Sequence, residues 1–336
     1  MKQALTLSLA SLLSVAALPA NAQNYRVAHF TPQTSTTAHF DQKFAQLVTD
    51  ATGGKTTFEF FWGGALGSGA EIVHLLTGGA IKIGGSAPVY YPSELPISGL
   101  TNSLPTLFDD VETAMRVQRR LTTGNPLFLK EASSIGIYPL VQHGLSASHL
   151  MCTKPVSTVT DLSGLRVRTY GYFLPAAMSA IGMTPINMGT TEMYEGLERG
   201  MIDCVAVSYG TASSYKIAEV AKYWSDINLG ALSGPVLYAS QTTYFNDWDD
   251  TMRAIVNEAS SKVFEEEISY LSTFDEEALE KAHEAGVELI HFTEQAKVNE
   301  MIPNMLDLWE ERQVSTGMPA DVAAEVVSAV RAELGK

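Results

Sequence analysis

The residue types that most often bind metals or act as nucleophiles are present, but their spacing does not match a known site. None of the seven histidines forms a His-x-x-x-His or His-Glu-x-x-His pair, the spacing at which two imidazoles on one helix hold zinc. Segment 144–148 lacks the second glycine of a nucleophile elbow, and the glycine-rich segment 63–69 matches neither a phosphate-binding loop nor a dinucleotide fingerprint. We therefore expect no metal site, no cofactor and no enzymatic activity.

The composition excludes several classes of protein. The chain has 336 residues, of which 46% are hydrophobic, so it can build a large core and is not intrinsically disordered. Its 37 acidic and 22 basic side chains give a net charge of −15, which repels nucleic acids and anionic membrane surfaces. We expect no nucleic-acid partner, and the length suggests two domains.

The N-terminal segment has the features of a secretory signal peptide. Residues 1–22 contain one lysine, an apolar run and the small-residue pattern Ala20-Asn21-Ala22, which predicts cleavage after Ala22; an uncleaved anchor is the alternative. No later stretch is apolar and long enough to cross a bilayer. We expect an exported, periplasmic protein that is not itself embedded in the membrane.

Export opens two alternatives for the chain's two cysteines, Cys152 and Cys204. In an oxidising compartment they could form a disulfide bridge. The bridge would close a loop of about 50 residues and stabilise the fold by about 4 kcal/mol in the chain-entropy model. Otherwise they would remain two buried free thiols.

The apolar pattern predicts alternating strands and helices. Strands are expected at 25–30, 56–61, 138–143, 149–153, 165–169 and 204–208, with helices between them at 72–77, 114–121, 173–181 and 192–199. This alternation predicts an α/β architecture with largely parallel sheets. A single apolar stripe over 247–273 predicts a helix of about 40 Å, long enough to brace two lobes, and a separate acidic helix is expected over 275–285.

Three short motifs follow one another in the middle of the chain. They are Lys154-Pro155, then Asp-Leu-Ser-Gly-Leu-Arg-Val-Arg at 161–168, then Thr-Glu-Met-Tyr-Glu-Gly-Leu-Glu-Arg-Gly-Met-Ile-Asp at 191–203. In this order and spacing they resemble the solute-binding proteins of TRAP (tripartite ATP-independent periplasmic) transporters, in the DctP-like family. Leu66-Gly67, the Leu104-Pro105 turn and the long helix also fit, so the resemblance covers nearly all of residues 23–336.

The resemblance implies a periplasmic-binding-protein-like fold. Two α/β lobes would be joined by crossing strands and the long helix, with a ligand in the cleft between them at the carboxyl ends of strands. We assign residues 23–142 plus 234–273 to lobe I, and residues 143–233 plus 274–336 to lobe II.

The resemblance also implies an anchor for the ligand. In this family the arginine that closes the Gly-Leu-x-x-Arg strand pairs with the ligand carboxylate, and Arg168 occupies that position. A guanidinium suits this role because it offers two parallel N–H donors and stays charged. Arg166 would point to the same face of an ideal strand, so either arginine could pair with the ligand, although the motif favours Arg168. The alternative for each is a structural salt bridge.

Departures from the family pattern modify the expected pocket. Some members hold a second basic residue in the preceding strand, where this chain has His149; it could supply a hydrogen bond or be a core histidine. Many members carry an amide after the last motif, where this chain offers Ser208 and Tyr209 as replacements. Further candidates for the pocket wall are Tyr170, Trp62, Tyr90, Ser86 and Phe30, with core packing as the alternative for each aromatic ring.

From these observations we expect an exported receptor that captures an organic acid and delivers it to the membrane subunits of a TRAP transporter. The aromatic candidates favour a small or aromatic monocarboxylate or dicarboxylate over a highly hydroxylated sugar acid. A ligand-sensing subunit of a signalling system would share the same pocket. A secreted α/β enzyme is disfavoured, because no nucleophile–base or metal motif is found.

Overall fold

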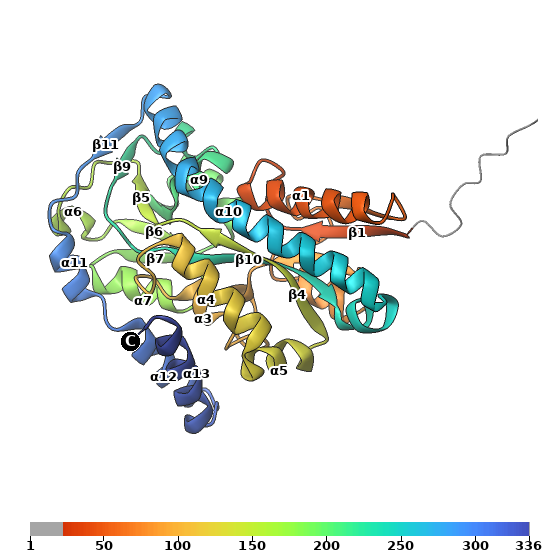
Figure 1. Ribbon diagram of the computed structural model, residues 1–336. Coiled ribbons are helices and arrows are strands. Elements are labelled where there is room, and N and C mark those ends of the chain that lie inside the picture. Colours follow the sequence, from red (N-terminus) through yellow and green to blue (C-terminus); the bar gives the residue numbers. More distant parts are fainter. Residues whose placement is uncertain (1–22, 336) are drawn as a thin grey trace, which may run out of the picture.

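Two β-sheets, one in each of two α/β lobes, organise the protein (Figure 1). The computed structural model describes residues 23–335. The predicted signal peptide and its cleavage after Ala22 lie outside the described residues. The two-lobe α/β fold predicted from the sequence is confirmed.

The first sheet has the strand order β2-β1-β3-β10-β4. Its strands are β1 (Gln23–His29), β2 (Thr56–Phe61), β3 (Ile83–Ser86), β4 (Ile137–Leu145) and β10 (Leu232–Ser240). Strand β1 pairs in parallel with β2 and β3, whereas β10 runs antiparallel to β3 and β4. The helices that follow these strands along the chain are α1 (Thr36–Ala51), α2 (Ile72–Thr77), α3 (Leu100–Ser103), α4 (Val111–Gly124) and α5 (Pro126–Ser134).

The second sheet has the order β11-β9-β5-β8-β6-β7. Its strands are β5 (His149–Cys152), β6 (Arg166–Thr169), β7 (Thr184–Asn187), β8 (Cys204–Val207), β9 (Tyr223–Ser225) and β11 (Glu288–Ile290). The helices of this half are α6 (Val159–Leu162), α7 (Phe173–Ala180), α8 (Met193–Glu198), α9 (Tyr209–Ser214), α11 (Gln295–Met301), α12 (Met305–Ser315) and α13 (Ala320–Glu333). Strand β5 is antiparallel to both of its neighbours.

The prediction of largely parallel sheets is therefore correct only in part. Strands β5 and β10 are the antiparallel members, and both adjoin the segments that carry the chain from one sheet to the other. A chain that leaves a sheet along β4 and returns along β10 must run in opposite directions in these two strands, so antiparallel pairing follows from the crossing.

Strands β4 and β10 approach each other closely where the chain crosses between the lobes. A Cβ atom at Gly234 would lie 2.9 Å from the carbonyl carbon of His143, closer than two such atoms can pack. A Cβ atom at Gly144 would lie 2.6 Å from the Met115 Sδ atom of α4. Glycine at both positions thus allows the two strands and the helix to meet at this point.

Helix α10 (Asp250–Glu284) runs along both lobes as one continuous helix of 35 residues (Figure 1). It contacts α1 and β4 on one side of the crossing and α9 on the other. The prediction of two separate helices, 247–273 and 275–285, is wrong. No glycine or proline interrupts the segment, so no helix-breaking residue separates its two parts. The helix begins after Asp249, whose side chain accepts a hydrogen bond from the Met252 N–H at 2.8 Å.

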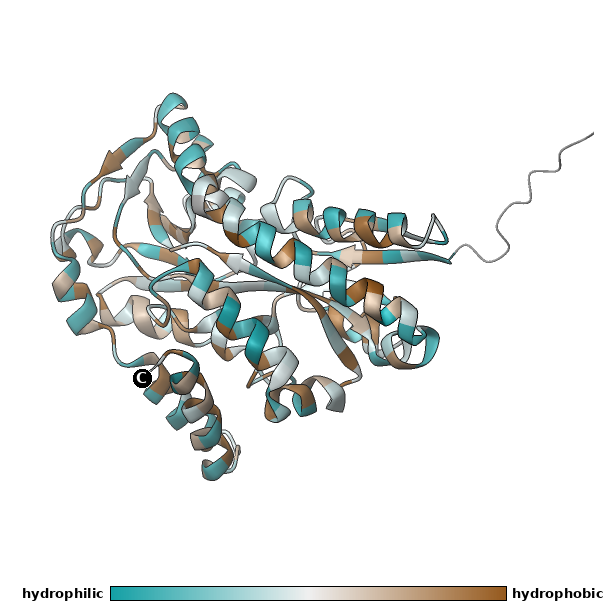
Figure 2. Cartoon of the chain, in the orientation of Figure 1, coloured by the Kyte–Doolittle hydropathy of each residue, from teal (hydrophilic) through white to brown (hydrophobic). Residues whose placement is uncertain are grey.

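The predicted lobe boundaries at 142/143, 233/234 and 273/274 stay predictions. Strands β4 and β10 and helix α10 each run through one of them without a break. One large hydrophobic cluster also joins α3 and α4 to the second sheet, and the Nε1 atom of Trp309 in α12 donates to the Pro96 carbonyl at 3.3 Å. Along the helices, hydrophobic and hydrophilic residues alternate, as expected for helices with one face on a sheet (Figure 2).

A fully buried group of four ionisable side chains ties the first sheet to α1 and α10. His143 of β4 contacts Glu267 of α10 at 2.8 Å through Nδ1 and Asp41 of α1 at 3.1 Å through Nε2. Asp41 also lies 3.1 Å from the Nε2 atom of His29. Burial lowers the pKa of His143, but the two carboxylates outweigh it and raise the pKa to about 10. His143 is therefore an imidazolium held between two carboxylates.

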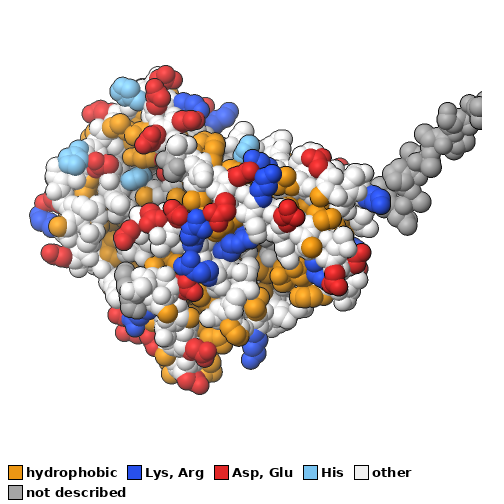
Figure 3. Space-filling model, viewed as in Figure 1, with side chains coloured by type: hydrophobic (Ala, Val, Ile, Leu, Met, Phe, Trp, Pro, Cys, Tyr) orange, Lys and Arg blue, Asp and Glu red, His pale blue; other side chains and the backbone are white. Residues whose placement is uncertain are grey.

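The surface in Figure 3 mixes both signs of charge, with acidic groups among the positive groups. The Nη2 atom of Arg116 on α4 lies 2.9 Å from a Glu265 carboxylate oxygen on α10, and its Nε atom lies 2.8 Å from Glu112.

Candidate ligand-binding site

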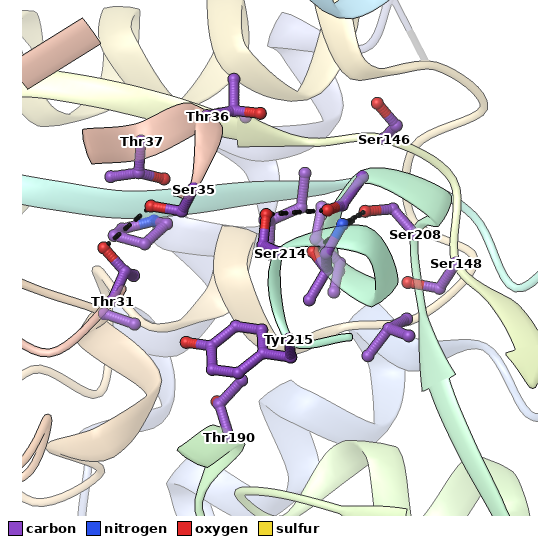
Figure 4. Close-up of a pocket in the computed structure, with 18 of the residues that line it drawn as sticks. Thr31, Ser35, Thr36, Thr37, Ser146, Ser148, Thr190, Ser208, Ser214 and Tyr215 are labelled. Carbon is purple, nitrogen blue, oxygen red and sulfur yellow. Dashed lines mark hydrogen bonds between the residues drawn. The ribbon is translucent and has the colours of Figure 1, made fainter. Parts of the chain in front are cut away.

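A cavity of about 110 Å³ lies between the lobes, and most of its polar wall consists of hydroxyl groups (Figure 4). The labelled hydroxyl-bearing residues of Figure 4 are Thr31, Ser35, Thr36, Thr37, Ser146, Ser148, Thr190, Ser208, Ser214 and Tyr215. They come from the β1–α1 connection, the β4–β5 crossing, the β7–α8 connection and α9 with its flanking residues. The cavity therefore combines contributions from both sheets, as expected for a ligand enclosed by two lobes.

Two charged residues are found among the described lining residues, Arg168 and Asp275. Arg168 lies on β6, near the carboxyl end of the strand, and is 2% exposed. Its Nε atom donates to the Met188 carbonyl at 3.1 Å, and its Nη2 atom donates to Thr190 Oγ1 at 3.0 Å. Its guanidinium carbon lies 4.6 Å from the centre of the Tyr170 ring.

No carboxylate among the described residues pairs with the Arg168 guanidinium. Its Nη1 group has no hydrogen-bond partner in the described part of the chain. A buried guanidinium without a counter-ion is costly, because its charge is removed from water without compensation. The site is therefore suited to an anionic group supplied from outside the chain, and a carboxylate fits a guanidinium in two parallel hydrogen bonds.

Arg166, two residues earlier on β6, has a different environment. It forms a two-pronged pair with Asp203: Nε to Oδ2 at 3.0 Å and Nη2 to Oδ1 at 2.8 Å. Its Nη1 atom also donates to the Gly200 carbonyl at 2.7 Å. The Arg166 guanidinium holds the pKa of Asp203 below its usual range. Arg166 is thus fully engaged in a structural ion pair outside the cavity.

A direct contact closes one side of the cavity. The Tyr90 hydroxyl, from the first lobe, lies 2.7 Å from Thr190 Oγ1, which also accepts from Arg168. Phe30 packs its ring edge-to-face on Tyr90, with centroids 5.5 Å apart. A larger groove on the outer side of these residues shares Phe30, Tyr90, Tyr170 and Thr190 with the cavity wall. The Tyr90–Thr190 contact therefore separates the enclosed space from this outer groove.

Of the residues selected from the sequence, five line the cavity and four lie elsewhere. Those in the wall are Arg168, Tyr170, Ser208, Tyr90 and Phe30. Those outside it are Trp62, Ser86, His149 and Tyr209.

The four residues outside the wall have partners of their own. Trp62 stacks on Phe60 with centroids 4.6 Å apart. Ser86 Oγ donates to the Gly69 carbonyl at 2.6 Å. His149 stacks on Tyr209 at 4.5 Å, and its Nδ1 atom lies 3.1 Å from the Ile227 carbonyl oxygen.

Sequence reasoning missed the hydroxyl groups at the start of α1 and the acidic residue on α10. A signal for the first was present, because residues 34–37 read Thr-Ser-Thr-Thr directly after a strand. The Ser35 side chain caps the helix by accepting from the Ala38 N–H at 3.1 Å. Asp275 had no such signal, since it falls in a run of acidic residues that is typical of a solvated helix face.

The two cysteines form a disulfide bridge. Cys152 of β5 and Cys204 of β8 face each other directly in the antiparallel pair, with Cα atoms 4.1 Å apart. Of the two alternatives left open by the sequence, the bridge is the one present. It encloses β6 and therefore Arg168.

No helix in the described part of the chain is long and apolar enough to cross a membrane. Within residues 23–335 no cluster of three or more His, Cys, Asp or Glu side chains is arranged to hold a metal ion.

Comparison with known proteins identifies the family. Residues 27–314 match the DctP family, described as bacterial extracellular solute-binding protein, family 7. The C4-dicarboxylate-binding periplasmic protein DctP of Rhodobacter capsulatus is 25% identical over 298 residues, which cover 86% of this chain and 84% of that protein. Alignments to two uncharacterized curated relatives span only 34% and 55% of the lengths of those proteins.

Solved structures show the same fold. A TRAP periplasmic solute-binding protein from Roseobacter denitrificans, with bound β-D-glucuronate, has a TM-score of 0.78 at 22% identity and covers 92% of this chain and 99% of that one. DctP7 of Bordetella pertussis, an extracytoplasmic solute receptor binding pyroglutamic acid, has a TM-score of 0.79 at 19% identity, with coverage of 92% and 100%. The family predicted from the motifs is confirmed: the chain belongs to the DctP family of bacterial extracellular solute-binding proteins.

Proposed function

We propose that this protein captures a small organic acid in the periplasm and delivers it to the membrane subunits of a TRAP transporter. The Arg168 guanidinium binds the ligand carboxylate, and the hydroxyl groups of the wall surround the remainder of the molecule. Cleavage of the signal peptide after Ala22 releases the receptor into the periplasm.

The observation that carries this proposal is the environment of the Arg168 guanidinium. Its guanidinium is buried in the wall of an interlobe cavity and has no acidic partner among the described residues. Arg166 shows the contrast, because Asp203 and the Gly200 carbonyl accept its hydrogen bonds. Glucuronate and pyroglutamate, the ligands of the two structural neighbours described above, both carry one carboxylate, which supports a carboxylate as the common element.

Closure of the lobes would transmit the bound state to the transporter. The ligand would stabilise the closed arrangement in which Tyr90 reaches Thr190, and only that arrangement presents both lobe surfaces in a fixed relation. The earlier preference for a small or aromatic mono- or dicarboxylate stays a prediction. Two of its aromatic supports, Trp62 and Tyr209, do not line the cavity.

The test is a thermal-shift screen of the mature protein against a library of carboxylic acids, repeated on Arg168→Gln. An acid whose free concentration is 100 times its dissociation constant should stabilise the protein by about 2.7 kcal/mol. This stabilisation gives a clear rise in Tm. Loss of the guanidinium should abolish the shift for every acid, because the charged hydrogen bonds are lost.

Arg166→Gln is the matched control, since it removes the same charge from the same strand. It should lower the Tm of the unliganded protein slightly, through loss of the Asp203 pair, and leave the ligand-induced shift intact. Acid binding that survives in Arg168→Gln, or the absence of any binding acid, would contradict the proposal. A signalling subunit would give the same binding results, and loss of cellular uptake of the acid on gene deletion distinguishes the transport role.

A further inference from the structure

The cavity holds a second charged group that a simple carboxylate receptor does not need. Asp275 of α10 lines the same space as Arg168 of β6, yet the two side chains do not form an ion pair. They approach the cavity from different structural elements. The enclosed space therefore has a positive group on one part of its wall and a negative group on another.

The immediate surroundings of Asp275 leave its carboxyl group with unused acceptor capacity. Its Oδ1 atom accepts one hydrogen bond, from the Gly210 N–H of α9 at 3.3 Å. Burial raises its pKa, and the nearby Ser146, Gly210 and His149 lower it only in part. Burial also lowers the pKa of the His149 imidazole, which disfavours the charged form that could pair with Asp275. A carboxylate can accept about four hydrogen bonds.

Two buried hydroxyl groups of the wall have no hydrogen-bond partner in the described part of the chain, Ser146 Oγ and Tyr215 Oη. Buried polar atoms are almost always paired, and these two line the cavity, where a ligand can supply a partner. Figure 4 shows Ser146 and Tyr215 well apart on the cavity wall. Ser146 lies close enough to Asp275 to lower the pKa of its carboxyl group. Tyr215 lies close enough to Arg168 for the guanidinium charge to lower the pKa of its hydroxyl group, against the effect of burial.

The cavity thus has two polar ends, each with one charged side chain and one buried hydroxyl group. We propose that Asp275 and Ser146 form a second subsite, which binds an N–H or O–H donor on the ligand at the end remote from the carboxylate. This inference rests on the proposed function, since it takes the Arg168 end as the carboxylate subsite. The ligand is accordingly a monocarboxylic acid with a distal amino or hydroxyl group.

The same geometry disfavours a dicarboxylate. Arg168 is the one Lys or Arg among the described residues that line the cavity, so a second carboxylate would find no cation. It would instead meet Asp275, and two carboxylates that are close together in a dry site repel each other strongly.

The test uses four ring acids of similar size that differ at one position: trans-4-aminocyclohexanecarboxylate, trans-4-hydroxycyclohexanecarboxylate, 4-methylcyclohexanecarboxylate and cyclohexane-1,4-dicarboxylate. D-Glucuronate is added as a polyhydroxylated acid. Dissociation constants are measured by calorimetry for the unaltered protein, Asp275→Asn and Ser146→Ala. The amino or hydroxy acid should bind at least about 10-fold more tightly than the methyl acid and the diacid, because a hydrogen bond to a charged group is gained.

The variants identify which donor the subsite takes. Asp275→Asn should weaken the binding of the amino-substituted ring acid at least about 10-fold. It should weaken the binding of the hydroxy-substituted acid by only a few-fold, since the amide keeps an acceptor but loses the charge. Ser146→Ala should weaken the binding of both, because the ligand loses the hydroxyl group beside Asp275. Glu276→Gln is the matched control: it changes an exposed acid on the same helix and should change no affinity.

Arg168→Gln separates the two proposals. Binding that is lost in Arg168→Gln but unchanged in Asp275→Asn and Ser146→Ala would overturn the second subsite and leave the carboxylate receptor intact. Equal or tighter binding of the methyl acid or the diacid would also overturn the second subsite. If none of these acids binds the unaltered protein, both the receptor assignment for this ligand size and the second subsite are rejected.

Discussion

At the scale of single residues, the Tyr215 hydroxyl group is expected to contribute to ligand affinity and not to the stability of the unliganded protein. This group is buried in the cavity wall without a hydrogen-bond partner. Burial removes such a hydroxyl group from water, which costs free energy, and no hydrogen bond offsets this cost in the unliganded protein. We expect this hydroxyl group to gain a partner in the liganded state, by donating to the carboxylate that we propose Arg168 binds.

Tyr215→Phe should accordingly leave the free energy of unfolding of the unliganded protein unchanged or raise it slightly. The same substitution should weaken acid binding by about 1.5 kcal/mol, or roughly 10-fold, because one hydrogen bond to a charged group is lost. Chemical denaturation and calorimetry measure the two quantities. Tyr91→Phe is the control: Tyr91 accepts from the Val73 N–H at 2.9 Å and lies outside the cavity, so its loss should lower stability and spare affinity. A stability loss in Tyr215→Phe with unchanged affinity would contradict this view.

At the scale of elements, the disulfide bridge holds together the part of the second sheet that carries the anchor. It joins β5 and β8 across a sequence separation of 52 residues, and β6 with Arg168 lies inside the closed loop. In the chain-entropy model a loop of this length contributes about 4 kcal/mol by restricting the unfolded chain.

Replacement of both cysteines, Cys152→Ala and Cys204→Ala, should therefore lower the free energy of unfolding by several kcal/mol, up to about 4. The affinity for ligand should change little, provided that binding is measured well below the Tm, since neither sulfur lines the cavity. Addition of a reductant should lower the Tm of the unaltered protein toward that of the double variant and have no effect on the variant. Equal stability of the two proteins under oxidising conditions would rule out this role for the bridge.

Local patterns in the sequence predicted the helices and strands well, but they predicted the contacts between these elements poorly. The motif that ends in Arg168 indicated both the strand and the carboxyl-end position, because such spacing is set within one βα unit. The sequence predicted two helices where α10 is one, because the acidic residues at 275–277 interrupt the run of apolar positions. The placement of Trp62 and His149 depends on aromatic partners distant in space, which no single-sequence pattern specifies.

The buried ionisable group of His29, Asp41, His143 and Glu267 was likewise not foreseeable. Its members come from β1, α1, β4 and α10, and each alone looks like an ordinary polar residue of an amphipathic element. Only the three-dimensional packing brings them together, and only then does the raised pKa of His143 follow.

At the scale of the whole molecule, two buried groups make stability depend on pH in the same direction. Burial raises the pKa of Glu131 from 4.5 to about 7, although the Ile97 and Ser98 N–H groups oppose it. The pKa of His143 is raised from 6.5 to about 10. Both groups bind their proton more tightly in the folded than in the unfolded chain, so the stability they contribute is complete below the unfolded pKa and is lost as pH rises through the folded pKa.

We therefore expect the Tm to fall first between about pH 4.5 and 7, as Glu131 is forced to ionise in the fold, and again between about pH 6.5 and 10, as His143 loses its proton between two carboxylates. Scanning calorimetry at constant ionic strength measures both steps. Glu131→Gln should remove the first step and keep the second, because a neutral amide cannot ionise. A Tm that is constant or rises from pH 6.5 to 10 would show that His143 is not held as an imidazolium. The four-residue group would then be a neutral hydrogen-bond network, and α10 would depend on packing alone to stay fixed to β4.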